Sequence, residues 1–241
     1  MTFDARTIAA AAESTPDAPA APAEEKEAAL TAWLGARGSA LLGFSGGVDS
    51  AYLAVAALEA LGRERFLAVI GRSASYPEEQ WLQARAVADR FNIPVLEVDT
   101  RELEDPSYAS NPTNRCYFCK SELWNRLVPL ARERGLAVVI DGTNADDLGD
   151  YRPGAGAAAE RRVESPLADV GLTKAEIRAL SHRRGLSGWD RPSSPCLSSR
   201  IPYGIAVTTA RLRRIGPPSV RCAIWELPVT CASATTAILP G

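Results

Sequence analysis

The sequence predicts an α/β protein in which a doubly wound parallel sheet is joined to a smaller, incomplete C-terminal segment. Short, continuously apolar runs recur along the chain, stretches with helical periodicity separate them, and polar loops follow each run. Continuously apolar strands that alternate with helices are typical of a parallel sheet covered on both faces. With 241 residues and 46% hydrophobic content, the chain can supply a substantial core.

The first half of the sheet is predicted from a helix followed by two strand–helix units. An amphipathic helix over residues 24–38 precedes a buried strand at Ala40–Phe44. A helix at Asp49–Leu61 and the strand "RFLAVI" at 65–70 come next. The helix over 77–91 then begins at a proline, a residue favoured in the first turn of helices.

The second half repeats the alternation and predicts where a ligand would bind. The strand "PVLEV" at 94–98 is followed by a long polar loop, a helix at Ser121–Arg134 and the strand "LAVVI" at 136–140. In doubly wound sheets, ligands bind beyond the carboxyl ends of the strands. The four loops that follow the strands are therefore expected to converge on one site.

Composition divides the chain into four parts. Residues 1–23 are rich in alanine and proline and predict a disordered tail, and residues 24–170 form the sheet domain. Residues 171–214 are predicted to be a substrate segment, because a capped helix leads there into an irregular, arginine-rich stretch suited to an anionic substrate. Residues 215–241 lack amphipathic periodicity, and we interpret them as a frameshifted or truncated end.

Charge and composition argue against several classes of function. The chain carries 27 basic and 29 acidic residues, so neither a nucleic-acid partner nor membrane binding is expected. It has no apolar run of 18 residues and no signal peptide, which predicts a cytoplasmic protein. His182 is the single histidine, so a multi-histidine zinc site is excluded, and we expect it on a helix surface.

The sequence "SGGVDS" joins the first strand to the next helix and predicts a phosphate-binding turn. Gly46 and Gly47 let an anion approach the backbone N–H groups, and the hydroxyls of Ser45 and Ser50 add donors. Asp49 is expected to hold Mg²⁺ that bridges the phosphates. The alternative is an ordinary tight turn. The Walker pattern is absent, since no lysine follows the glycines.

The stretch "DGTNADDLGDYRP" after the fourth strand predicts a second part of the same site. Asp141, Asn144 and Asp147 are candidate contacts to the nucleotide or its metal. An Asx turn with a purely structural role is the alternative.

Three cysteines form a candidate metal site. Cys116 and Cys119 make a CxxC pair, and Cys196 lies far downstream. Three thiolates on a [4Fe-4S] cluster would leave one iron open to carry an exchangeable sulfide. The alternatives are a redox CxxC pair and a zinc site completed by another residue. Cys222 and Cys231 lie in the atypical tail and receive no role.

The "SGGVDS" turn resembles that of the PP-loop ATP pyrophosphatases, which cleave ATP between the α- and β-phosphates. Together with the glycine turn, "NPTNRCYFCKSELW", "DGTNADDLGDYRPG", "SPLADVGLTKAEIR" and "PCLSSRIPYG" resemble the LarE family over about residues 24–214. The resemblance implies an adenine nucleotide alpha hydrolase-like fold, ATP and Mg²⁺. The implied substrate is a pyridinium dicarboxylate mononucleotide, whose carboxylate is adenylated and becomes a thiocarboxylate during synthesis of the nickel-pincer cofactor of lactate racemase.

The same resemblance gives the cysteines and Arg200 their expected roles. LarE-like chains with one cysteine, at the position of Cys196, sacrifice its sulfur. Those with three, at the positions of Cys116, Cys119 and Cys196, bind a [4Fe-4S] cluster and use sulfide or another sulfur donor. This chain has all three, which favours the cluster form and implies that residues 171–214, which include Cys196, are also the sulfur-transfer segment. Arg200 suits the substrate's phosphate, and a homo-oligomer is expected.

Two other functions fit parts of the sequence. A tRNA thiolase of the PP-loop superfamily can also use three cysteines, but it would require zinc-ribbon pairs or an RNA-binding appendage that the sequence does not display. A catalytically incomplete protein that binds nucleotide and metal is the other alternative, and the atypical tail is its main support.

Overall fold

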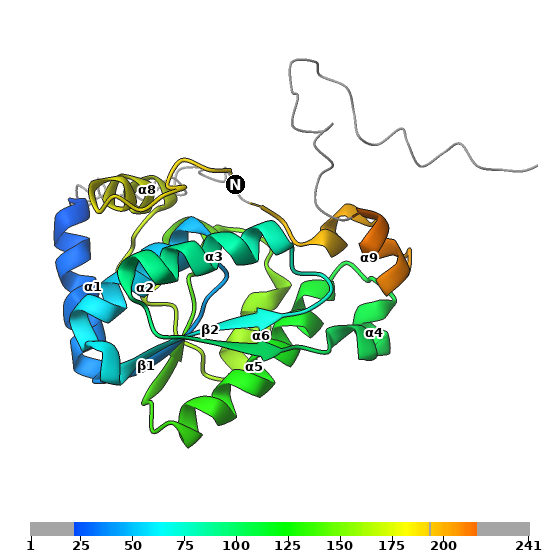
Figure 1. Ribbon diagram of the computed structural model, residues 1–241, viewed down its shortest axis with the longest axis horizontal. Helices are drawn as coiled ribbons and strands as arrows, with labels where there is room; N and C mark the ends of the chain where they lie inside the picture. Colours follow the sequence, from blue (N-terminus) through cyan, green and yellow to red (C-terminus); the bar gives the residue numbers. More distant parts are fainter. Residues whose placement is uncertain (1–21, 193, 216–241) are drawn as a thin grey trace, which may run out of the picture.

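A computed structural model describes residues 22–192 and 194–215. Its centre is a sheet of four parallel strands in the order β3-β2-β1-β4, formed by β1 (Ala40–Gly43), β2 (Phe66–Arg72), β3 (Val95–Asp99) and β4 (Val138–Ile140). The chain builds from β1 toward β3 and then returns to place β4 on the other side of β1. This arrangement confirms the predicted doubly wound parallel sheet (Figure 1).

The strands bury both faces because successive side chains point to opposite sides. In β1, Ala40 and Leu42 pack in a cluster with α1 (Ala23–Arg37), α2 (Val48–Leu61) and α3 (Glu78–Phe91). Leu41 faces the other way and packs with α5 (Arg115–Glu133) and α6 (Pro153–Glu160). Helices therefore cover the sheet on both sides, as Figure 1 shows.

Gly43 fixes how closely α5 approaches the sheet. A Cβ atom at this position would lie 2.7 Å from the ring of Trp124, which is fully buried on α5. Glycine at the end of β1 is therefore required by packing as much as by the turn that follows it.

Helix α5 begins earlier than the sequence predicts. The expected start is Ser121, but the helix starts at Arg115, so Cys116 and Cys119 lie in its first two turns and not in a loop. Asn114 stands at the N-cap. The early start is hard to see in the sequence because cysteine and aromatic residues have only modest helix propensity.

A third apolar cluster fastens the end of the described chain to the sheet domain. Its buried members come from α4 (Pro106–Ala109), η4 (Leu197–Arg200), α9 (Thr209–Ile215) and the segments between them. They are Tyr108, Leu197, Ile201, Val207 and Leu212. This cluster places residues 196–207, here called the cysteine loop, against the start of α5.

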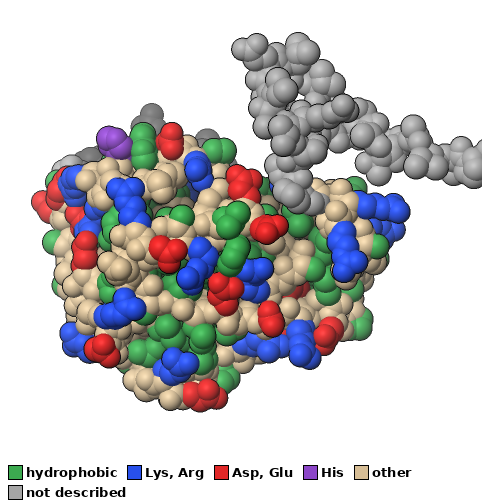
Figure 2. Space-filling view, viewed as in Figure 1, with side chains coloured by type: hydrophobic (Ala, Val, Ile, Leu, Met, Phe, Trp, Pro, Cys, Tyr) green, Lys and Arg blue, Asp and Glu red, His purple; other side chains and the backbone are tan. Residues whose placement is uncertain are grey.

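The other short elements are α7 (Pro166–Asp169), α8 (Lys174–Arg183) and the 3-10 helices η1 (Arg63–Arg65), η2 (Glu102–Glu104) and η3 (Ala145–Gly149). The predicted tails, 1–23 and 215–241, lie almost entirely outside the described residues. Within the described part, no helix is long and apolar enough to cross a membrane. Acidic and basic side chains are interspersed over the face in Figure 2, and basic ones gather at the end where α9 lies.

Candidate functional site

The glycine turn lies where the sheet changes direction. It follows β1, and the loop after β4, the neighbouring strand, comes next to it, since an added Cβ on Gly142 would meet the backbone of Ser50 at 3.0 Å. In open α/β sheets the crevice at such a switch point is where ligands bind. The turn thus occupies the position that the sequence predicts for a nucleotide site.

The conformation of the turn depends on its glycines and serines. Gly46 has a φ of 75°, and a Cβ there would lie 2.7 Å from the Cβ of Ala84 on α3. Gly47 is the N-cap of α2, so the positive end of that helix faces the turn. The Ser50 hydroxyl donates to the Gly47 carbonyl at 3.0 Å and lies 3.1 Å from the Ser45 hydroxyl. These contacts shape a cradle for an anion.

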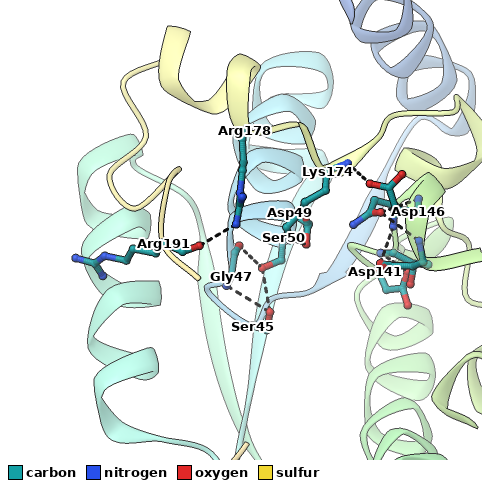
Figure 3. A network of polar contacts seen from close by, with 12 residues as sticks. Ser45, Gly47, Asp49, Ser50, Asp141, Asp146, Lys174, Arg178 and Arg191 are labelled. Carbon is teal, nitrogen blue, oxygen red and sulfur yellow. Dashed lines mark hydrogen bonds and ion pairs between the residues drawn. The ribbon is translucent and has the colours of Figure 1, made fainter. Parts of the chain in front are cut away.

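Asp49 has the properties expected of a metal ligand. One carboxylate oxygen, Oδ2, forms an ion pair with Lys174 of α8, and Figure 3 shows both residues beside the turn. The other, Oδ1, is buried and has no hydrogen-bond partner among the described residues. Burial raises the pKa of Asp49, with a further contribution from nearby Asp147, against the lowering effect of Lys174. A buried, unpaired carboxylate oxygen beside a phosphate cradle fits a Mg²⁺ ligand.

The loop after β4 is shaped by its own side chains. Asp141 Oδ1 accepts hydrogen bonds from the Thr143 N–H at 3.0 Å and from the Ser165 hydroxyl at 2.9 Å. Asn144 and Asp147 form a capping box at the start of η3. Asp141 and Asn144 thus have structural roles, and their contact with a nucleotide stays a prediction.

Cations that the sequence analysis did not single out surround the turn. A cleft of about 320 Å³ runs between the turn, α3 and the segment after α8, and Asp147, Arg152, Lys174 and Arg191 are among its lining residues. Arg152 pairs with Asp147 at 2.5 Å. Lys174 was missed because it is far from the turn in sequence. Two signals were available: Lys174 begins a helix with a capping box, and it lies in the block "SPLADVGLTKAEIR" that resembles the LarE family.

The three cysteines approach one another from α5 and the cysteine loop. Cys116 is exposed, and Cys119 and Cys196 are half-buried. Burial raises the pKa of Cys119 to about 12, and the charges of Glu102, Cys196 and Cys116 act in the same direction. Cys196 Sγ lies 3.2 Å from the Ser199 hydroxyl. The fold therefore places the three cysteines in the same region of the molecule, and their role as a sulfur site stays a prediction.

The thiols are not arranged around a single ion. Among residues 22–192 and 194–215, no three His, Cys, Asp or Glu side chains are grouped so that they could hold one metal ion. The donor set of three thiols still suits an iron–sulfur cluster chemically. Arg200 is exposed on η4 and is not part of the cleft lining. His182 is exposed and lies against Trp189, with ring centroids 4.5 Å apart.

The loop after β2 connects the two sites. The Tyr76 hydroxyl donates to the Ser45 carbonyl at 2.9 Å, which holds the glycine turn. The Ser75 carbonyl accepts from the Leu197 N–H at 2.9 Å, which holds the residue next to Cys196. Two consecutive residues thus set the separation between the phosphate cradle and the sulfur site.

The raised pKa of Cys119 predicts unequal thiol reactivity. Only the thiolate reacts with iodoacetamide, so at pH 8 we expect Cys119 to be modified at least about tenfold more slowly than exposed Cys116. The folded-state pKa lies above the unfolded one, so the reactivity of Cys119 should increase as pH rises toward 12. Peptide mass mapping over time measures both rates. Equal rates at pH 8 would contradict this assignment.

The NAD synthase family model matches residues 30–126. An uncharacterized protein of Synechocystis sp. is 46% identical over 193 residues, covering 80% of this chain and 72% of the relative. A pyridinium-3,5-bisthiocarboxylic acid mononucleotide synthase of Lactiplantibacillus plantarum is 32% identical over 206 residues, covering 81% and 75% of the two chains.

Two solved structures resemble the fold. An NH3-dependent NAD synthetase from Campylobacter jejuni superposes with a TM-score of 0.57 at 19% identity, covering 70% of this chain and 76% of the other. An NMN synthetase from Francisella tularensis gives a TM-score of 0.57 at 19% identity, covering 80% and 84%. At this level of identity, the likeness extends to the fold alone.

Proposed function

The chain belongs to the LarE family of PP-loop enzymes, and from this premise we propose that it is an ATP-dependent sulfur transferase. Its substrate is a pyridinium dicarboxylate mononucleotide, one carboxylate of which is adenylated and then converted to a thiocarboxylate. The reaction releases AMP and pyrophosphate and contributes to the nickel-pincer nucleotide cofactor. We place it in the cytoplasm, where reducing conditions keep the thiols free.

The observation that best supports ATP activation is the buried Oδ1 of Asp49 beside the glycine turn, which has no hydrogen-bond partner within the part of the chain that the structure describes. When bound, Mg²⁺ would offset the charge of the phosphates. Asp49 would hold the ion, with Asp147 close by. The N–H groups of the turn would bind the pyrophosphate, and Lys174 and Arg152 would stabilise its negative charge.

The sulfur step is assigned to Cys116, Cys119 and Cys196. We propose that these thiols hold a [4Fe-4S] cluster, which when bound would carry an exchangeable sulfide. The presence of all three cysteines supports this form over the sacrificial one. The chain's own contribution is to bring the thiols together and to limit water around Cys119, which is packed in the third apolar cluster. Arg200 is proposed to bind the mononucleotide's phosphate from the exposed end of η4.

Anaerobic reconstitution tests both halves of this proposal. Purified protein treated with iron and sulfide should gain an absorbance band from the cluster, and Cys116→Ala should not retain it. AMP should form from ATP only when the pyridinium mononucleotide is present. AMP formation that is independent of the mononucleotide would contradict the proposed substrate. A colourless protein that loses one sulfur at Cys196 would contradict the cluster form.

A further inference from the structure

Asn111 connects the start of the CxxC region to the cysteine loop. Its side chain is fully buried, and its Nδ2 donates to the carbonyls of Ile201, Pro202 and Ile205 at 3.2, 2.8 and 3.0 Å. Its backbone carbonyl accepts from the N–H of Gly204 at 2.9 Å. Asn111 therefore holds residues 201–205 of the cysteine loop through four hydrogen bonds. It does so from the left-handed region, at a φ of 57°.

Arg115 makes a second connection next to the first cysteine of the pair. Its Nη1 donates to Asn111 Oδ1 at 2.6 Å and to the Ser198 carbonyl at 2.8 Å, and its guanidinium lies 5.9 Å from the ring of Tyr203. The residue is 2% exposed and makes no ion pair with the described residues. Burying an arginine without a carboxylate partner is costly. Cys116 follows Arg115 directly, so the positive charge of the arginine lies close to the predicted thiolate site.

The side chains around this network bring Cys196 toward Cys119. The Tyr108 hydroxyl lies 2.7 Å from the Ser198 hydroxyl, and both groups are buried. Leu197, the neighbour of Cys196, shares an apolar cluster with Tyr108, against which Cys119 packs. The cysteine loop is thus held by polar contacts and by packing on the side that faces α5.

We propose that Asn111 and Arg115 are positioning residues that hold Cys196 opposite Cys119. Neither residue is assigned contact with substrate or sulfur. They act through the backbone of the cysteine loop, so their loss lets Cys196 move away while the glycine turn keeps its structure. The use of the paired thiols rests on the proposed function, whereas their placement can be measured without it.

The test measures how fast the two thiols are bridged. Dibromobimane becomes fluorescent when two thiols displace both bromides, so it reports on pairs that are held close together. The starting protein carries alanine in place of the other cysteines, Cys116, Cys222 and Cys231. In it, Asn111→Gly keeps the left-handed backbone and removes the side chain. We expect bridging of Cys119 and Cys196 to slow about tenfold relative to single-thiol alkylation, since three hydrogen bonds are lost.

The matched control is Asn92→Gly. Asn92 is exposed at the end of α3 and is also left-handed, with a φ of 54°, so the control carries the same backbone change. Its bridging rate should equal that of the starting protein. Arg115→Met removes the contacts of the guanidinium with Asn111 Oδ1 and the Ser198 carbonyl, and should slow bridging by about threefold. This milder variant decides the question if Asn111→Gly does not fold by circular dichroism.

Two results would overturn the positioning role. One is a folded Asn111→Gly protein that is bridged as fast as Asn92→Gly. The other is bridging in the starting protein that is no faster than independent alkylation of the two thiols. The proposed function can fail separately. Slowed bridging in Asn111→Gly would support the positioning role. A wild-type chain that makes no AMP with the mononucleotide would contradict the assigned reaction.

Discussion

Asp49→Asn is expected to lower the rate of AMP formation by about 10²- to 10³-fold, comparable to removing one stabilising group from a transition state. Asparagine keeps the shape of the side chain but removes the negative charge that Mg²⁺ requires. It also removes the ion-pair partner of Lys174, whose positive charge is then available to the phosphates. ATP binding should therefore be weakened less than turnover. Chromatographic measurement of AMP at saturating ATP and Mg²⁺ gives the rate.

Asp150→Asn is the matched control, because it makes the same chemical change at an aspartate whose side chain is 71% exposed. It should retain nearly the full rate. If Asp49→Asn were as active as this control, Asp49 would not be the metal ligand.

The same residue predicts how activity depends on pH. The pKa of Asp49 is raised by burial, so a proton competes with Mg²⁺ at a higher pH than it would at an exposed aspartate. As pH falls, AMP formation should therefore decrease before ordinary surface carboxylates titrate. Raising the concentration of Mg²⁺ should shift this loss toward lower pH.

Cys196→Ser is expected to abolish thiocarboxylate formation and to leave adenylation in place. The hydroxyl can neither donate sulfur nor hold a cluster iron as a thiolate does. The glycine turn is held by Tyr76 and Gln80, neither of which depends on the cysteine side chain. Exchange of labelled pyrophosphate into ATP, measured with the mononucleotide present, should therefore persist while the thiocarboxylate is undetectable.

A Cys119→Ser variant distinguishes the cluster form from the sacrificial form. If the cluster carries the sulfur, Cys119→Ser should also lose repeated turnover. If Cys196 gives up its own sulfur, Cys119→Ser should complete one turnover at the wild-type level. A Cys196→Ser chain that still makes thiocarboxylate would contradict both forms.

The sequence was sufficient for the sheet and for the glycine turn because both depend on local pattern. The apolar run at Ala40–Phe44, two glycines and then a helical pattern can hardly be interpreted as anything but a strand, a turn and a helix. The start of α5 was placed too late, since "CYFC" carries no strong helix signal and a metal-binding loop was the competing interpretation. Helix α6 was not predicted either, because its glycines and alanines show little periodicity.

Residues that act through long-range contacts could not be found from sequence. Lys174 reaches Asp49 across 125 positions, and Asn111 reaches the cysteine loop across about 90. No local pattern predicts such contacts, because they depend on tertiary packing: α8 packs with α2 beside the sheet, and the cysteine loop packs in the third apolar cluster. Asp141 and Asn144 have local hydrogen bonds that shape their own loop, and their predicted contact with a nucleotide remains to be tested.

The most direct test is the mass of the product formed from the pyridinium dicarboxylate mononucleotide with ATP, Mg²⁺ and ³⁴S-labelled sulfide after anaerobic reconstitution. We predict a thiocarboxylate that contains the labelled sulfur, formed in equal amount with AMP over several turnovers. Recovery of the unchanged dicarboxylate with no AMP, while ATP remains bound, would contradict the assignment of this chain as a sulfur transferase.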